Sequence, residues 1–64
     1  MSTAAPALTL VDTYAAAVAT GIRPGTIRVL LHRGKLAAHG HDHTGRTLVA
    51  LEDVTAYAQR RAAA

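Results

Sequence analysis

The chain lacks cysteine, phenylalanine and tryptophan, and has only two tyrosines among its 64 residues. Without cysteine there is no disulfide framework to support a secreted protein of this size, so we expect a cytoplasmic location. Without large aromatic side chains the core has to be small and aliphatic. A chain this short buries only ~60% of its unfolded surface, so we expect one domain that is marginally stable by itself.

Long hydrophobic runs are also missing. No stretch approaches the ~20 apolar residues of a membrane helix, and residues 1–10 lack the features of an export signal, so we expect no membrane partner. The predicted organisation is a flexible tail over 1–9, a folded domain over 10–61 and a frayed C-terminus over 62–64. A chain this short has no room for an enclosed active site. Thr44 and His43 could be imagined as a nucleophile and its base, but a third orienting group is missing, so we expect no enzyme and no cofactor.

Positive charge is what the chain has in excess, with a formal net charge of +3 and a pI near 10.2. Residues 23–46 hold five of the basic side chains against Asp42 alone, while the rest of the chain is close to balanced. This clustering favours a polyanionic partner, with an ordinary solvated basic surface as the plainer alternative.

Helix start and stop signals divide the first half of the chain. Asp12 can cap a helix over about Thr13–Thr20, and Gly21 supplies the left-handed residue that ends it. Pro24 suits the first position of a second helix, which runs to about Arg33. Two helices this close cross at a steep angle, so the first can brace the second in a DNA major groove.

The second helix has two different faces. Ile27, Leu30 and Leu31 have the spacing of one apolar stripe, which should face the core. The opposite face is left for a partner and comprises Gly25, Arg28, Val29 and His32, with Thr26 and Arg33 on its flanks.

A β-hairpin, or wing, and a third helix are expected in the second half of the chain. The runs 35–39 and 46–50 are short enough to be strands, and Gly40 and Gly45 permit the turn between them. A helix over about 51–61 would bury Val54 and Tyr57 and carry Arg60 and Arg61 in its last turn. The predicted fold is mainly α with a small two-stranded wing, a winged helix-turn-helix.

The order of these features covers most of the chain, from about Leu10 to Arg61. It is carried by Ala16, Ala17, Gly21, Thr26, Ile27, Leu30, Gly34, Leu36, Gly45, Arg46, Leu48, Asp53, Val54 and Tyr57. In order and spacing these residues resemble the small winged helix-turn-helix domains of the MerR-like, excisionase and BldC-like families. Two positions depart from the family pattern: Leu30 stands where many members have Trp, and Arg23 replaces the usual Ser or Thr cap.

This resemblance implies sequence-specific binding of double-stranded DNA, with the second helix in the major groove and the wing along the backbone or minor groove. The protein would be a nucleoid-associated transcriptional regulator, or an excisionase-like recombination directionality factor with an integrase or recombinase as partner. One module reads few base pairs, so we expect several copies on DNA, and the resemblance favours a head-to-tail arrangement.

Each basic or polar residue of the outer face has an expected role. Arg28 is the candidate for a bidentate guanine contact, Val29 suits a thymine methyl, His32 could reach a base or a phosphate, and Gly25 lies on the same face. The expected phosphate contacts, which position the domain without reading sequence, are Arg23, Thr26, Arg33, Lys35, Thr44 and Arg46.

Two further interpretations remain open. The domain could be a protein-interaction module that binds a recombinase, a polymerase subunit or another copy of itself. On an extended strand His39, His41 and His43 would converge on one face, where they could bind zinc, nickel or copper. Gly40 and the nearby turn oppose a regular strand over all three, so we expect no metal site and exposed wing histidines near phosphate instead. Protonation of these histidines at about pH 6 could instead strengthen DNA binding.

Overall fold

The computed structural model describes residues 8–63, which form three helices and a two-stranded antiparallel sheet. Of the expected tail over 1–9, only Leu8 and Thr9 lie within this range. Of the expected frayed end over 62–64, Ala62 and Ala63 lie within it. The elements follow the order β1 (Leu10–Asp12), α1 (Thr13–Thr20), α2 (Pro24–His32), β2 (Leu48–Ala50) and α3 (Leu51–Ala63). The mainly helical class expected from the sequence is therefore confirmed.

Helix α1 begins and ends where its capping residues predict. The Asp12 carboxylate accepts a hydrogen bond of 2.8 Å from the Ala15 N–H, which satisfies one free donor of the first turn. Gly21 has a φ of 76° and donates its N–H to the Ala17 carbonyl at 2.8 Å. A left-handed residue at this position closes the helix, so the chain turns at once toward α2.

Helix α2 starts at Pro24 after an extended Arg23, whose side chain makes no capping hydrogen bond. It ends at His32, one residue earlier than predicted. Gly34, with a φ of 74°, donates to the Leu31 carbonyl at 3.1 Å, and Lys35 donates to the Leu30 carbonyl at 2.8 Å. This pair of bonds is a Schellman motif, and it turns the chain back toward the core.

The sheet differs from the predicted wing. β2 pairs with β1, with Leu10 opposite Ala50 and Asp12 opposite Leu48, whereas residues 35–39 form no strand. The 37–47 loop has one β-bridge, between His41 and Thr47. Its two arms are also joined by backbone hydrogen bonds of 2.9 Å from the His39 N–H to the Leu48 carbonyl, from the Leu48 N–H to the Gly40 carbonyl and from the Asp42 N–H to the Arg46 carbonyl. Gly40 has a φ of 97°, which interrupts the extended backbone that a regular ladder needs. The predicted regular strand over 35–39 is therefore wrong, and the expected wing is a hydrogen-bonded hairpin loop beside a β1–β2 sheet.

Helix α3 follows β2 without a break and continues to Ala63, two residues beyond the predicted end. Its first turn is joined to the start of the described chain. The Leu51 N–H donates to the Thr9 carbonyl at 2.8 Å, and the Thr9 N–H donates to the Glu52 carboxylate at 3.0 Å. These bonds attach Thr9, which the sequence placed in the tail, to the folded domain.

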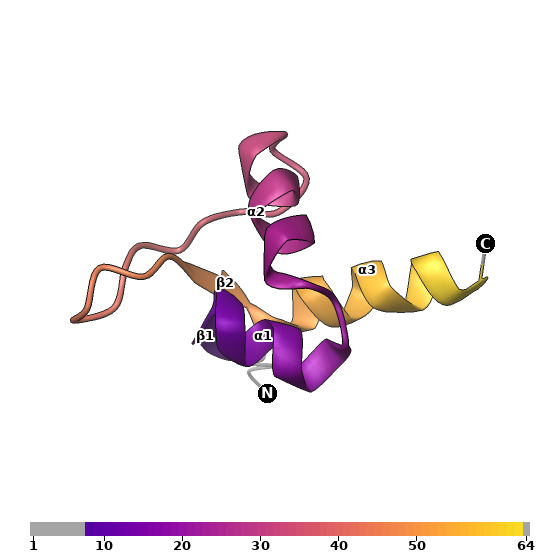
Figure 1. The fold of residues 1–64 in the computed structure, drawn as a ribbon, viewed down its shortest axis with the longest axis horizontal. Coiled ribbons are helices and arrows are strands. Elements are labelled where there is room, and N and C mark those ends of the chain that lie inside the picture. Colours follow the sequence, from indigo (N-terminus) through magenta and orange to yellow (C-terminus); the bar gives the residue numbers. More distant parts are fainter. Residues whose placement is uncertain (1–7, 64) are drawn as a thin grey trace, which may run out of the picture.

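The core is small and aliphatic, as the composition requires. Its buried cluster consists of Ala16, Ile22, Ile27, Leu30, Leu36, Val49 and Val54, with Tyr57 and Ala58 packed against it. Figure 1 shows α2 rising from the layer that contains α1, the sheet and α3, with the 37–47 loop extending to one side. One face of α2 is thus anchored in the core while the rest of the helix projects from the domain.

Candidate nucleic-acid interface

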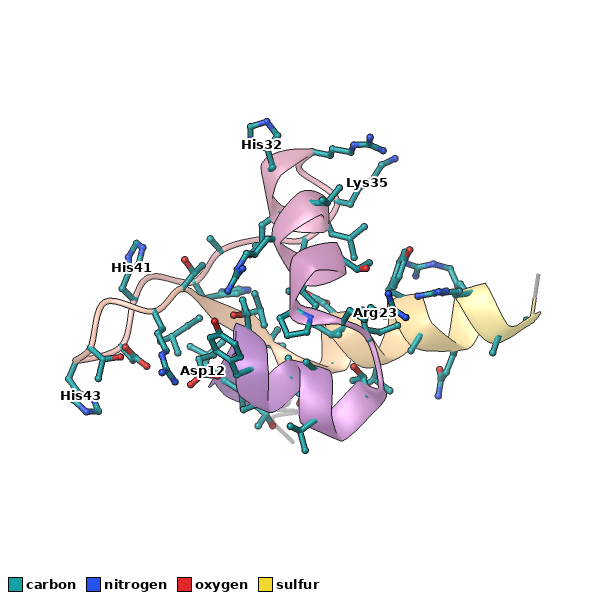
Figure 2. All side chains as sticks on the ribbon, in the orientation of Figure 1. Asp12, Arg23, His32, Lys35, His41 and His43 are labelled. Carbon is teal, nitrogen blue, oxygen red and sulfur yellow. The ribbon has the colours of Figure 1, made fainter. Side chains whose placement is uncertain are left out.

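The outer face of α2 is exposed along its whole length. Ile27 and Leu30 are buried on the inner side, while Gly25, Arg28 and Val29 are exposed, as the apolar stripe predicts. Figure 2 shows Arg23 at the base of α2 and His32 near the opposite end of the helix. The helix therefore presents small, aliphatic and basic side chains on a surface that a groove could accept.

Two arginines from distant parts of the chain meet on Tyr14 of α1. The Arg28 Nη2 donates to the Tyr14 hydroxyl at 2.8 Å, and its guanidinium carbon lies 5.5 Å from the ring centroid. The Arg46 guanidinium carbon lies 5.0 Å from the same centroid. Both distances lie within the range of cation–π attraction. We call Tyr14, Arg28 and Arg46 the tyrosine cluster.

The tyrosine cluster remains accessible to a ligand. Tyr14 is 47% exposed, and a surface cleft of about 340 Å³ is lined by the cluster with Thr13, Leu31 and Thr47. The Arg46 Nη1 also lies 3.5 Å from Asp12 Oδ2, although more than half of the Arg46 side chain is exposed. The cluster therefore joins α2 to the 37–47 loop and keeps two positive charges at the surface.

A second cleft lies between α2 and α3 and has a volume of about 440 Å³. Its apolar part comes from Val29, Leu30 and Tyr57, and its polar part from Thr26, Arg33, Lys35 and Arg60. Figure 2 shows Lys35 near the end of α2 that is farthest from α1. We call this site the α2–α3 cleft.

The tip of the 37–47 loop is organised by one carboxylate. Asp42 Oδ1 accepts hydrogen bonds from the Thr44 hydroxyl at 2.6 Å, the Thr44 N–H at 2.9 Å and the Arg46 N–H at 3.0 Å. The Thr44 hydroxyl and the Arg46 N–H are the main causes that lower the pKa of Asp42 to about 2. The Thr44 hydroxyl proton is thus used inside the loop, where it positions the tip.

The three histidines of the loop do not converge as an extended strand would require. His39 is half-buried, and its buried Nε2 has no hydrogen-bond partner among the described residues. His41 and His43 are exposed and point to opposite sides of the loop (Figure 2). Within residues 8–63 no group of three or more His, Asp or Glu side chains could hold a metal ion. The alternative of a metal site on one extended strand therefore has no support among the described residues, and Gly40, with a φ of 97°, is the position that interrupts such a strand.

The structure groups the predicted phosphate contacts in a way the sequence does not show. Arg33 and Lys35 lie in the α2–α3 cleft, Arg46 lies in the tyrosine cluster, and Arg23 is exposed at the start of α2. Arg60 was not predicted as a site residue, because the sequence places it only in the last turn of the third helix, far along the chain from Arg33 and Lys35. Only the fold, in which α2 and α3 both pack against α1 and line one cleft, shows that Arg60 faces the same opening as Arg33 and Lys35.

Tyr14 was also missed as a functional residue. It is one of two tyrosines and lies on a helix of small side chains, which was the one available signal.

Comparison with protein families, curated proteins and solved structures finds no match to this chain. In the part of the chain that the structure describes, the helices are too short or too polar to cross a membrane.

Proposed function

We propose that the protein is a winged helix-turn-helix domain that binds double-stranded DNA in a sequence-specific manner. α2 enters the major groove, and the 37–47 loop acts as the wing along the backbone or minor groove. The domain serves as a small transcriptional regulator or as a recombination directionality factor. In the second role an integrase or recombinase is its protein partner.

The observation that carries this proposal is the placement of positive charge around α2. The tyrosine cluster, with Arg28 and Arg46, lies on the side of the helix that faces the loop. Arg33 and Lys35 lie on the side that faces α3. A helix in a major groove has a phosphate backbone on each side, so cations are needed on both flanks. The two clusters supply them.

The residues of α2 divide into those that read bases and those that position the domain. Arg28 can hydrogen-bond guanine, because only one of its five donors is used on Tyr14. Val29 and His32 are exposed on the same helix, and Gly25 leaves the helix start open for a close approach to DNA. Arg23, Thr26, Arg33, Lys35 and Arg46 contact phosphates, whereas Thr44 holds the tip of the loop.

A single module of this size contacts few base pairs, so tight binding requires several copies. We propose that these bind in a head-to-tail row on direct repeats. No catalytic activity or resident cofactor belongs to this proposal.

Fluorescence anisotropy of a labelled random duplex, titrated at several salt concentrations, tests the proposal. We expect micromolar binding that weakens with salt by roughly 0.9 logarithmic units per phosphate contact and per tenfold salt. Selection from a random library should then yield an operator that contains guanine. Absence of binding at low salt would contradict the proposal and favour the protein-interaction module. Sensitivity to a chelator would instead implicate the histidines of the loop.

A further inference from the structure

The α2–α3 cleft brings a basic residue of α3 to the surface that α2 presents. Arg60 lies in the last turn of α3 and lines the same cleft as Arg33 and Lys35. We infer that this cleft binds the sugar-phosphate backbone of one DNA strand, with Arg60 as a further phosphate contact. The inference rests on the proposed function and extends its interface from α2 and the loop to α3.

The side chains of the cleft carry positive charge that favours binding of an anion. Arg33, Lys35 and Arg60 come from three separate parts of the fold, namely the C-cap of α2, the turn after it and the last turn of α3. No acidic residue lines the cleft, and within residues 8–63 none of the three cations forms an ion pair. Three like charges around one opening repel one another, so binding of a phosphate there is favourable.

The floor of the cleft suits a sugar as well as a phosphate. Leu30 is 8% exposed, Tyr57 is half-buried, and Val29 is 47% exposed, so an apolar surface lies between the cations. A deoxyribose ring can pack on this surface while its phosphate oxygens meet the basic side chains. The Thr26 hydroxyl is a further hydrogen-bond donor in the same cleft.

The position of the cleft also agrees with a duplex on α2. Arg28 is held on the other flank of the helix by Tyr14, so the two basic clusters lie on different sides of α2. The two phosphate backbones that border a major groove are about 12 Å apart across its opening. We therefore assign the α2–α3 cleft, with Arg60, to the strand on the α3 side and Arg46 of the tyrosine cluster to the other strand, while Arg28 reads a base between them.

Arg60 and Arg61 form a matched pair for the test. Both are exposed in the last turn of α3, but Arg61 is rotated by about 100° and lies outside the cleft. Arg60→Gln should lower the magnitude of the salt slope by ~0.9 and weaken binding to all duplexes alike. Arg60→Lys should restore the slope, since it keeps the charge, and Arg61→Gln should behave as the unmodified protein. Circular dichroism melting of each variant shows whether the fold is retained.

The outcomes separate this inference from the proposed function. If the unmodified protein binds duplex with a salt dependence that Arg60→Gln and Arg61→Gln leave equally unchanged, the cleft does not bind the backbone although the DNA proposal stands. If the unmodified protein ignores duplex DNA, the proposed function itself fails. Arg60-dependent binding of a polyglutamate peptide in the absence of duplex binding would identify an acidic protein segment as the occupant and overturn the inference.

Discussion

The guanidinium of Arg28 donates a 2.8 Å hydrogen bond to the hydroxyl of Tyr14, across the crossing of α1 and α2. This bond fixes one end of a long side chain whose free rotation would otherwise be lost on binding DNA. Arg46 lies over the same ring, so the position of the loop and that of the α2 arginine are coupled through Tyr14. Tyr14 is therefore a positioning residue for two side chains that face the proposed ligand.

Tyr14→Phe removes the hydroxyl and keeps the ring on which Arg28 and Arg46 lie. We expect discrimination at the guanine that Arg28 is proposed to read to fall by about 1 kcal/mol, because one net hydrogen bond of that size orients the side chain. The salt slope should stay the same, since no phosphate contact is lost. Competition anisotropy with operator duplexes that differ at that guanine measures both quantities. Equal discrimination by the unmodified protein and the variant would remove Tyr14 from the readout.

Arg28→Ala and Lys35→Ala should have different signatures. Loss of a bidentate guanine contact relaxes specificity at one position by ~1–3 kcal/mol. Loss of a phosphate contact weakens binding to every duplex and lowers the magnitude of the salt slope by ~0.9. Titrations of operator and random duplex at several salt concentrations distinguish the two. A uniform loss for Arg28→Ala, on all sequences, would reassign Arg28 to the phosphate set.

The ends of α1 and the start of α2 could be predicted because their signals are local. Asp12, Gly21 and Pro24 each act on a backbone group within a few residues, so the sequence carries the whole interaction. The buried face of α2 was predictable for the same reason, since Ile27 and Leu30 lie one turn apart on a single helix.

The sheet and the basic clusters could not be predicted because they depend on residues far apart in the chain. β1 has three residues, too few for alternation to be visible, and it is defined by its pairing with β2, in which Val11 lies opposite Val49. The sequence likewise identifies arginines but not their side of the fold. Arg28 and Arg46 lie on one ring, and Arg33 and Arg60 line one cleft, because α2 and α3 both pack against α1.

Gly34 should be a position where any side chain destabilises the fold. Its φ of 74° is unfavourable for other residues, although no neighbouring atom lies within 4 Å of an added Cβ. Gly34→Ala should therefore lower the free energy of unfolding by ~1–2 kcal/mol, the conformational cost alone. Gly25→Ala is the control, because Gly25 lies inside α2 with ordinary φ and open space, and alanine there should stabilise by ~0.5–1 kcal/mol. Urea denaturation of both variants measures the two changes, and a shift of the same sign in both would contradict the left-handed assignment of Gly34.

Asp42 should make the order of the loop tip sensitive to acid. Hydrogen bonds from Thr44 and Arg46 lower the pKa of this carboxyl from its ordinary value of 3.8 to about 2, because they stabilise the charged form. The pKa is lower in the folded chain than in the unfolded chain, so the stabilisation is complete above about pH 4 and is lost as the pH falls through about 2. The loop should therefore hold its conformation at neutral and mildly acidic pH.

An NMR titration of the Thr44 and Arg46 backbone amides from pH 6 to about pH 1.5 reports this change directly. Both amide protons donate to Asp42 and should shift together with a midpoint of about 2. Asp42→Asn should abolish that transition and leave the titration of Glu52 in place. The pKa of Glu52 is also lowered, by a hydrogen bond from the Thr9 N–H, so the Thr9 amide serves as the internal reference. A midpoint near the ordinary aspartate value for the loop amides would show that the Asp42 bonds do not organise the tip, and Thr44 would then be free to contact a phosphate.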